Sequence, residues 1–468
     1  MASRRAGTPS RVSIGSSANA ERIAKYNNCD DYVPIGIASA MVGEPSGSAH
    51  TNHDTRSLSN APSYMDQCST SSEQSVSSSN TASVRSGMAN LSFNDEQPSK
   101  SHPPQPPKTV TVQQPNENRP RPTKKKQQAA NSFDIAKAIQ KCKDDVLSIF
   151  DVSKSQLTYL PASIKELTCL RELYLYQNKL AQLPNELGFL SQLQTLGVSE
   201  NSLTGLPDSL INLRKLRVLD LRHNKLNEIP PVVYQLTSLK TLYLRFNRIK
   251  VVDNEIGSLS ALTMLSLREN RIDSLPAAIG RLTSLVGLDV SYNHLKSIPF
   301  DIGNCTQLQS LDLQYNELKQ LPHSIGCLRA LSRLGLRYNQ LESLPQTLAH
   351  CSQIQEFNIE SNSVLVLPDG LLSSLVNLTS VTLSRNKFDG FPMGGPMQFK
   401  SVTSLSMELN QVSNIPYGIF SQAECLTKLN MSINQLTSLP LDIRTWNRIV
   451  ELNLGTNLVG IGNTCLLK

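Results

Sequence analysis

The sequence predicts an α/β solenoid, and three observations support this prediction. Residues Leu216 to Pro230 read L-R-V-L-D-L-R-H-N-K-L-N-E-I-P, which fits the pattern L-x-x-L-x-L-x-x-N-x-L followed by x-x-[LI]-P. The asparagine of this pattern recurs every 23 residues from Asn178 to Asn362, and then at intervals of 23 or 24 residues as far as Asn457. Leucines alternate within each copy. A fixed period of this length with this leucine pattern is typical of a leucine-rich-repeat solenoid, a horseshoe with a parallel β-sheet on its concave face.

Each part of the repeat has a physical reason. The alternation of Leu219 and Leu221 predicts a strand with one buried face. The asparagine carries two donors and an acceptor on a short side chain, so it can bond backbone groups of neighbouring turns that would otherwise be buried without partners. The Leu-Pro or Ile-Pro pair, as in Leu275-Pro276, ends the strand and starts an outer return segment. We expect apolar residues of that segment, such as Ile279 and Leu282, to face the core.

Residues 1–130 form the first region, which is rich in Ser, Asn, Pro, Gln and Gly. Its low hydrophobicity predicts a disordered tail, with a proline-rich linker near its end. Two segments in it, R-V-S-I at 11–14 and L-S-F at 91–93, place two apolar residues in alternation near a basic residue. Such a peptide can add to the edge of a sheet in a partner protein.

Residues 131–150 follow with helical spacing of Ile135, Ile139, Cys142 and Val146. We expect an amphipathic helix here, capped by residue 131 or 132, that shields the open core of the first repeat.

The repeats are predicted over 151–460, about 14 copies, of which the first has Ser155 in place of the asparagine and the last is incomplete. The segment F-P-M-G-G-P at 391–396 predicts a distorted return segment, because paired glycines and flanking prolines exclude a regular helix. Residues 461–468 do not continue the pattern, and we expect the core of the last repeat to lack a cap from this chain. This ending suggests either a C-terminally shortened form or a partner that covers this end.

Composition excludes several classes of protein. The net charge of +7 is divided into +4 over residues 1–130 and +3 over the rest, which does not indicate a nucleic-acid-binding protein. The sequence contains no apolar run that could span a membrane and no signal peptide. Cys305 and Cys351 occupy a leucine position of the repeat, which favours an intracellular protein with reduced thiols. We find no catalytic motif, metal motif or cofactor motif, and therefore predict a protein that is not an enzyme and binds no cofactor.

The variable positions of the concave face carry the candidate function. Two residues before the asparagine, three consecutive repeats place Arg222, Arg245 and Arg268, a column of like charge on neighbouring strands. Acidic neighbours such as Asp220 and Glu269 could neutralise this column internally. We favour the alternative, which is an acidic protein partner, because exposed tyrosine beside arginine is typical of protein interfaces. The aromatic residues expected beside the arginines are Tyr174, Tyr176, Phe246, Tyr292, Tyr315 and Tyr338.

Several phrases are more specific than the general repeat. They are S-I-K-E-L-T-x-L-x-E-L-Y-L-Y-x-N-K-L at 163–180, V-L-D-L-R-H-N-K-L at 218–226, T-L-Y-L-R-F-N-R-I at 241–249, L-S-R-L-G-L-R-Y-N at 331–339 and G-G-P-x-Q-F at 394–399. In these phrases the chain resembles the Shoc-two/Sur-eight family of Ras-binding leucine-rich-repeat scaffold proteins. The resemblance covers about residues 135–458.

The resemblance implies a scaffold that binds GTP-loaded Ras and the catalytic subunit of protein phosphatase one on its concave face. The assembly would remove an inhibitory phosphate from a Raf kinase and promote MAP-kinase signalling in the cytoplasm, at membranes through Ras, or in the nucleus. The phosphatase-docking peptide maps onto Leu91 and Phe93, where leucine replaces the preferred valine or isoleucine. The implied contact residues on the concave face are Tyr174, Tyr176, Glu200, Asp220, Arg222, His223, Arg245, Arg268, Glu269 and Arg337.

A second hypothesis is a cortical or cell-polarity adaptor that binds another acidic protein. Such adaptors share L-P-x-x-I-G-x-L repeats but lack the R-H-N and R-F-N phrases at 222–224 and 245–247. Members of the Shoc-two/Sur-eight family carry more repeats than this chain. The resemblance therefore does not tell whether this chain makes the contacts that the C-terminal repeats of the family make.

Overall fold

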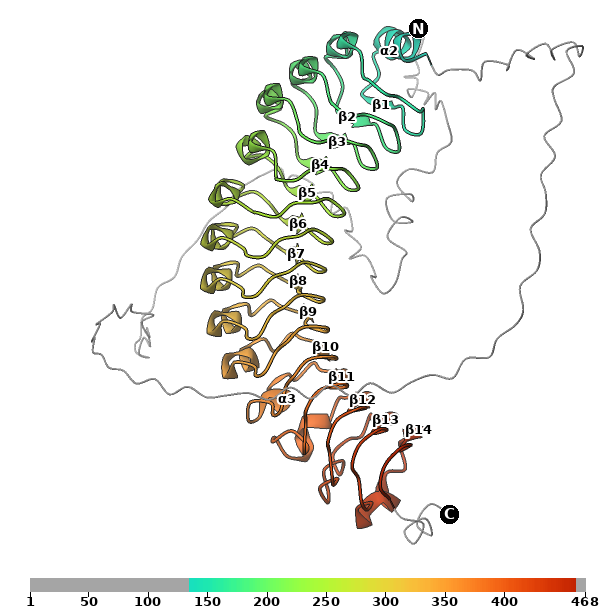
Figure 1. Ribbon diagram of the computed structural model, residues 1–468, viewed down its shortest axis with the longest axis vertical. Coiled ribbons are helices and arrows are strands. Elements are labelled where there is room, and N and C mark those ends of the chain that lie inside the picture. The colour runs from blue at the N-terminus through green and yellow to red at the C-terminus, as the bar shows by residue number, and fades with distance from the viewer. Residues whose placement is uncertain (1–133, 460–468) are drawn as a thin grey trace, which may run out of the picture. The chain divides into compact units, whose positions relative to one another are not determined.

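The computed structural model describes residues 134–459 of the chain. Within this range the predicted solenoid is confirmed: short strands pair in parallel into one 14-stranded sheet whose order follows the sequence from β1 to β14 without a crossover. The strands lie along the inner side of the curved stack of repeats, and the return segments lie along its outer side (Figure 1).

Each strand is three residues long. The strands are β1 Ile149–Asp151, β2 Glu172–Tyr174, β3 Thr195–Gly197, β4 Val218–Asp220, β5 Thr241–Tyr243, β6 Met264–Ser266, β7 Gly287–Asp289, β8 Ser310–Asp312, β9 Arg333–Gly335, β10 Glu356–Asn358, β11 Ser380–Thr382, β12 Ser404–Ser406, β13 Lys428–Asn430 and β14 Glu451–Asn453.

The register places equivalent residues of neighbouring repeats directly opposite each other. Leu196 of β3 pairs with Leu219 of β4, which in turn pairs with Leu242 of β5. These central residues have no exposed surface. Because side chains alternate along a strand, the residues on either side of each central leucine project from the concave face, and this alternation places the candidate site.

Most return segments are short 3₁₀ helices that begin directly after the Leu-Pro or Ile-Pro turn. Pro276, for example, precedes the 3₁₀ helix Ala277–Arg281, in which Ile279 is fully buried, as is Leu282 after it. The expected inward direction of these side chains is therefore confirmed. The other 3₁₀ helices are Ala162–Glu166, Asn185–Phe189, Asp208–Asn212, Pro231–Gln235, Asn254–Ser258, Phe300–Asn304, His323–Cys327, Gln346–His350, Pro396–Phe399 and Leu441–Thr445, and one return segment forms the short helix α3 Leu371–Ser374.

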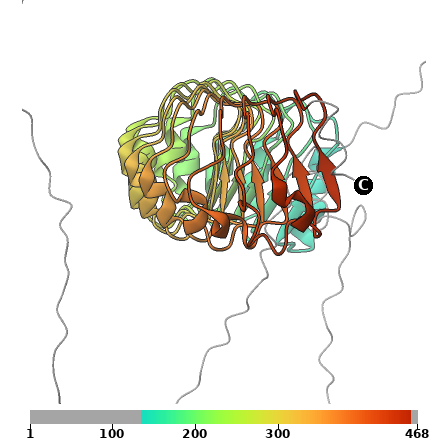
Figure 2. The same cartoon turned by 90° about the horizontal axis from the view of Figure 1, so that it is seen from below.

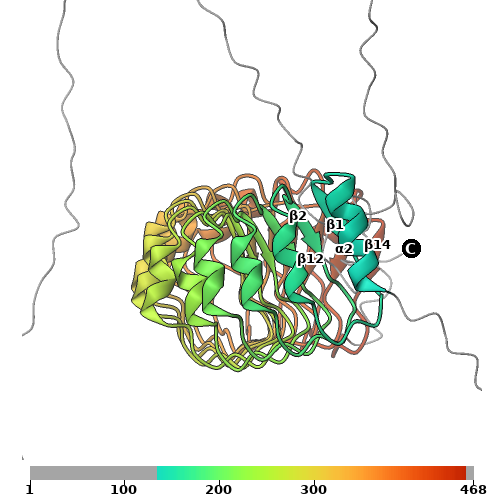
Figure 3. The same ribbon diagram turned by 90° about the horizontal axis from the view of Figure 1, so that it is seen from above.

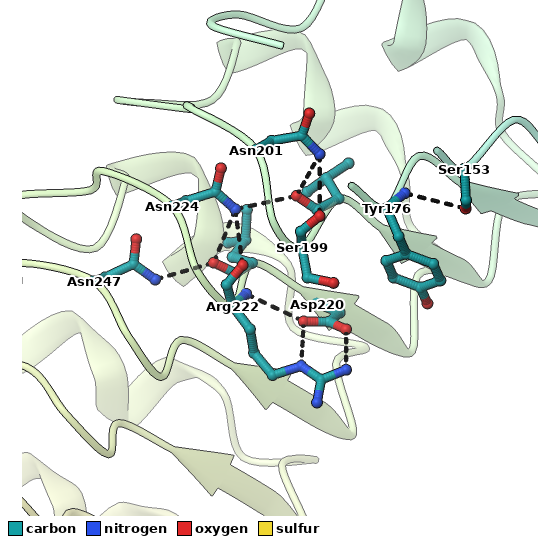
Figure 4. Close-up of polar contacts among 10 residues, drawn as sticks. Ser153, Tyr176, Ser199, Asn201, Asp220, Arg222, Asn224 and Asn247 are labelled. Atoms are coloured by element: carbon teal, nitrogen blue, oxygen red, sulfur yellow. Dashed lines mark hydrogen bonds and ion pairs between the residues drawn. The ribbon is translucent and has the colours of Figure 1, made fainter. Parts of the chain in front are cut away.

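The asparagines form the ladder that the sequence predicts. Asn224 donates from Nδ2 to the carbonyl oxygen of Val198 in the preceding repeat at 3.1 Å and to that of Leu221 at 3.1 Å. Its Oδ1 accepts a hydrogen bond from the amide of Leu203 at 2.9 Å. Figure 4 shows Asn201, Asn224 and Asn247 in equivalent positions. Each asparagine thus joins its own turn to the repeat before it.

The N-terminal helix is shorter than the sequence predicts. Helix α2 spans Ile135–Asp144, and its cap is Asp134, whose side chain accepts a hydrogen bond from the amide of Lys137. The predicted cap at residue 131 or 132 lies outside the described residues. The helix ends at Asp144, before Val146, which has a φ of 48°, is exposed and does not join the apolar face. The chain then enters β1, which means that the repeats begin at Ile149 and not at 151.

The predicted burial of the helix face is otherwise correct. Ile135, Ile139 and Cys142 are buried in the same core as the first leucines of the repeats. Figure 3 shows α2 beside β1 and β2 at the N-terminal end of the stack. The helix therefore covers apolar surface that a solenoid leaves open at its first repeat.

The far end of the described repeats differs. Figure 2 shows this end with β14 as the last strand. Leu452 at the centre of β14 is 39% exposed, whereas Leu429 at the same position of β13 is 1% exposed. Residues 460–468, including the predicted non-repeat end, lie outside the described range.

The break at 391–396 is irregular, as expected. The 3₁₀ helix of this repeat begins only at Pro396, after Gly395, which has a φ of 67°. Phe391, Phe399 and Phe420 form ring contacts there, with centroids 5.5 to 5.8 Å apart. The return segment of this repeat is thus a shortened 3₁₀ helix, and aromatic rings pack beside it.

Cys305 and Cys351 are fully buried free thiols, which confirms their place in the core. Burial raises the pKa of each thiol to about 11. Between residues 134 and 459, no helix has both the length and the hydropathy needed to cross a bilayer.

Candidate protein-binding face

The three arginines of the predicted column lie side by side on the concave face. The register pairs Asp220 with Tyr243 and Tyr243 with Ser266. Arg222, Arg245 and Arg268 each follow two residues later, so they occupy equivalent positions on neighbouring turns. Their surroundings differ, and the differences decide which of them is available to a partner.

Arg222 is neutralised by its own strand. Its Nε and Nη2 donate to the two carboxylate oxygens of Asp220 at 2.8 and 2.6 Å, with side-chain exposures of 13% and 6% (Figure 4). Burial opposes the charged form of Arg222, but the bonds to Asp220 outweigh this effect and raise its pKa. At Arg222 the alternative of internal neutralisation therefore holds, because the charge of the guanidinium is paired with Asp220 of the same repeat.

Arg268 is also partly satisfied. Its Nε lies 3.3 Å from Oε1 of Glu269, and its guanidinium carbon lies 4.5 Å from the ring centroid of Tyr292. A contact of this kind between a guanidinium and an aromatic ring is attractive.

Arg245 is the exception within the column. Its Nε is buried and has no hydrogen-bond partner among the described residues. Burial lowers the pKa of Arg245, and the neighbouring charge of Arg222 lowers it further. An unpaired buried donor costs free energy. Of the three arginines, Arg245 is therefore the one at which a hydrogen-bond acceptor of a partner would contribute most to the free energy of binding.

The tyrosines at the N-terminal end pack against each other and against a glycine. The rings of Tyr174 and Tyr176 are 5.4 Å apart. A Cβ atom at Gly197 would overlap the ring of Tyr176, so the glycine leaves the space in which this ring lies. The hydroxyl of Tyr174 donates to Glu172 at 2.8 Å. Burial is the main reason that the pKa of both tyrosines is raised.

Other predicted site residues lie one position further along each repeat. Glu200, His223 and Glu269 each precede a ladder asparagine and have φ values from 52° to 55°. His223 stacks on Phe246 with ring centroids 4.1 Å apart, and burial lowers its pKa. Arg337 follows β9, three turns beyond Arg268, where its Nε donates to Gln314. The structure therefore does not place Arg337 in the arginine column of β4 to β6.

The N-terminal peptide candidates, Leu91 and Phe93 among them, lie outside the described residues.

Two acidic residues that were not predicted as part of the site lie on neighbouring strands of this face. Asp289 of β7 and Asp312 of β8 are direct partners in the register. Ser291 donates to Asp289 and Gln314 donates to Asp312, but neither carboxylate has an ion pair among the described residues. Burial raises the pKa of Asp312 to about 7, and it also raises the pKa of Asp289. The recurrence of Asp at the position of Asp220, without Arg two residues later, is the signal that could have identified them.

A row of residues continues along the edge of the concave face. The residue before each ladder asparagine has a positive φ in every regular repeat. We call this row the ridge; it consists of Gln177, Glu200, His223, Phe246, Glu269, Tyr292, Tyr315, Tyr338, Ser361, Arg385, Leu409, Ile433 and Thr456.

No group of three His, Cys, Asp or Glu side chains between residues 134 and 459 is arranged to hold a metal ion. The described part of the face presents guanidinium groups, carboxylates and aromatic rings on a parallel sheet.

Comparison with known proteins agrees with this description. A family model described as "Leucine-rich repeat region" matches residues 138–245, 185–266 and 216–315, and one described as "Leucine Rich Repeat" matches 307–328. A solved leucine-rich-repeat protein of Leptospira interrogans is 27% identical, with a TM-score of 0.57 over 71% of this chain and 96% of that one. A plant peptide hormone receptor in complex with its peptide is 29% identical, with a TM-score of 0.55 over 66% of this chain and 55% of the receptor. The chain is thus a leucine-rich-repeat protein of the scaffold class.

Its sequence is also similar to one group of such proteins. "Leucine-rich repeat protein soc-2 homolog" of Drosophila grimshawi is 54% identical over 94 residues, which are 20% of this chain and 15% of that protein. The homologue of the same name from Nematostella vectensis is 54% identical over 83 residues, which are 18% of this chain and 14% of the homologue. Over these segments the chain is similar to the soc-2 leucine-rich-repeat proteins, which agrees with the resemblance to the Shoc-two/Sur-eight family that its repeat phrases indicate. The match spans about one seventh of the length of these relatives.

Proposed function

We propose that the protein is a non-enzymatic scaffold that binds GTP-loaded Ras and the catalytic subunit of protein phosphatase one on its concave face. By holding both, it would bring the phosphatase to a Raf kinase and promote Ras and MAP-kinase signalling. The similarity to soc-2 homologues supports the class of partner, and the geometry of the concave face supports the mode of binding.

The observation that carries the proposal is the environment of Arg245. Of the three arginines in the column, it alone has a buried Nε without a partner among the described residues. Arg222 and Arg268 on either side are bonded to Asp220 and Glu269. A carboxylate of a partner that reached Arg245 would form a charge-assisted hydrogen bond in a site shielded from water. An acidic surface on the partner fits this requirement.

The neighbours of Arg245 favour a protein partner. The Arg245 guanidinium carbon lies 5.8 Å from the ring centroid of Phe246, which stacks on His223. Aromatic residues and arginine at the centre of a contact surface contribute most of the binding free energy in protein complexes. The carboxylates of Asp289 and Asp312 lie two and three turns further on and suit a basic group of the same or a second partner.

A charge reversal tests the proposal. We would immobilise GTP-loaded Ras, and separately GDP-loaded Ras, and measure binding of the full chain with and without the phosphatase subunit. Arg245→Glu should weaken binding to GTP-loaded Ras with the phosphatase by at least about 30-fold, since losing a buried charge pair costs about 2 kcal/mol or more.

The matched control is Arg281→Glu, which makes the same charge change at an exposed residue on the outer return segment. It should bind like the unchanged chain. Equal binding to both nucleotide states of Ras, or normal binding by Arg245→Glu, would contradict the proposal. Capture of a polarity protein in place of Ras would favour the adaptor hypothesis.

A further inference from the structure

The ridge contains a stack of three tyrosines that ends in a gap. Tyr292 and Tyr315 stack with ring centroids 4.1 Å apart, and Tyr315 and Tyr338 with centroids 4.3 Å apart, with interplanar angles of 15° and 10°. At one end of the stack the guanidinium of Arg268 covers Tyr292. At the other end, no ring or guanidinium within residues 134–459 contacts the second face of Tyr338.

Ser361 occupies the next position of the ridge, and Arg385 the one after it. Backbone hydrogen bonds fix this order: Asn339 donates to the carbonyl of Ser361 at 3.2 Å, and Asn362 donates to that of Arg385 at 3.2 Å. Serine is too small to cover the neighbouring ring, and Tyr338 is 37% exposed. The side chain of Arg385 is 53% exposed and is held by Glu360 at 3.4 Å.

The spacing of the turns suits one planar group. Neighbouring strands of a parallel sheet are about 4.8 Å apart, so the backbones at Tyr338 and Arg385 are about 9.6 Å apart along the ridge. The ion pair with Glu360 turns the Arg385 side chain toward the Ser361 turn, so the space between the two side chains is narrower than this. A planar group in contact on both faces needs about 7 to 8 Å between its neighbours. A single ring would therefore contact Tyr338 on one side and Arg385 on the other.

We propose that the gap over Ser361 binds one aromatic side chain of a protein partner. An aromatic ring is attracted by both sides of the gap, through stacking on Tyr338 and through a cation–π contact with Arg385. An arginine of the partner would also stack on Tyr338, but it would face the guanidinium of Arg385, and the nearby carboxylate of Glu360 is already paired with Arg385. Leu409 and Ile433, each 40% exposed at the next two ridge positions, extend the surface on which apolar atoms around that ring would pack.

Single-stranded nucleic acid fits less well. Binding of successive bases needs several open aromatic faces, but Tyr292 and Tyr315 cover each other and leave one open face at Tyr338. The gap thus accepts one ring and not a series. This inference does not depend on which protein occupies the concave face.

The test is to fill the gap with a ring from the chain itself. Ser361→Tyr places tyrosine at a ridge position whose φ of 57° matches the 53° to 55° of the three stacked tyrosines. The variant should therefore fold and continue the stack. Ser361→Ala is the control, because it leaves the gap open.

The probe is N-acetyl-tryptophanamide, titrated into the full chain while the backbone amide signals of Asn362 and Arg385 are followed by NMR. We expect a saturable shift of these signals in the unchanged chain and in Ser361→Ala, and at least tenfold weaker binding in Ser361→Tyr. If Ser361→Tyr melts at a lower temperature than the unchanged chain, Tyr338→Ala should show the same loss of binding.

Three results would overturn the inference: an equal shift in Ser361→Tyr, an equal shift with N-acetyl-leucinamide, or tighter binding of oligouridylate that Ser361→Tyr abolishes. Because the probe is a small molecule, these results are separate from the outcome with Ras and the phosphatase.

Discussion

Replacing Asp312 by asparagine should stabilise the protein at alkaline pH. Asp312 is 8% exposed and lies opposite the carboxylate of Asp289 on the neighbouring strand. Its pKa is raised from 3.8 to about 7, first by burial and then by the charge of Asp289. Because the folded protein binds a proton more tightly than the unfolded chain, the free energy of unfolding falls as the pH rises from about 4 to about 7.

The magnitude follows from the same two pKa values. The interval between 3.8 and about 7 corresponds to up to about 4 kcal/mol, at about 1.4 kcal/mol for each pH unit. Asparagine is close to aspartate in shape and keeps an acceptor for the amide of Gln314, which Oδ1 of Asp312 accepts at 3.1 Å. Asp312→Asn removes the charge and should therefore regain part of this free energy at pH 8.

Urea denaturation at pH 5 and at pH 8 measures the effect. The free energy of unfolding of the unchanged chain should be lower at pH 8 than at pH 5. For Asp312→Asn this decrease should be smaller, so that at pH 8 the variant is more stable than the unchanged chain. Asp208→Asn, at an exposed position of an outer 3₁₀ helix, serves as the control and should behave like the unchanged chain. If Asp312→Asn shows no gain at pH 8, the two carboxylates do not repel each other as the geometry requires.

Two further predictions concern the polar bonds of the sheet. Arg222→Ala should lower the free energy of unfolding by about 3 kcal/mol, because it leaves the buried carboxylate of Asp220 unpaired; a urea midpoint equal to that of the unchanged chain would show that the pair adds nothing. Asn293→Ala should cost about 3 kcal/mol, since it removes the acceptor of the Ile272 amide and the donor to the carbonyl of Leu267, both at 3.0 Å. Hydrogen exchange at Ile272 should then accelerate, and unchanged exchange there would contradict the role of the ladder.

Much of the fold could be predicted because the repeat is periodic. One asparagine in each period requires the same hydrogen bonds in each turn, so the spacing alone aligns the strands and brings Arg222, Arg245 and Arg268 together. The end of the N-terminal helix could not be predicted in this way. Val146 fits the helical spacing, but it adopts a left-handed conformation in the turn into β1. Tertiary pairing of β1 with β2 overrides the local pattern.

The site was harder to predict than the fold. The position two residues before each asparagine identified the arginine column. Whether each guanidinium is free to bind a partner depends on side-chain geometry. Asp220 ends β4 two residues before Arg222, and their pairing is the internal neutralisation that the sequence offered as the alternative. The partner of Arg268 is its own neighbour in sequence, Glu269. The unpaired Nε of Arg245 and the gap beside Tyr338 depend on which neighbouring side chains reach them, and spacing does not determine this.

The ridge has a consequence for how such proteins diversify. Its backbone conformation is the same with glutamine, histidine, phenylalanine, serine or isoleucine, with φ between 52° and 58° throughout. The asparagine that follows donates to the carbonyl oxygen just before the ridge residue, as Asn293 does to Ser291, and the amide of the ridge residue donates to the next repeat, as Tyr292 does to Gln314. Neither bond uses the ridge side chain. Selection can therefore exchange one recognition group for another at these positions while the scaffold is conserved. Interface designers have the same freedom, because altering one ridge residue changes the ring contacts of its immediate neighbours but leaves the backbone of the ridge as it is.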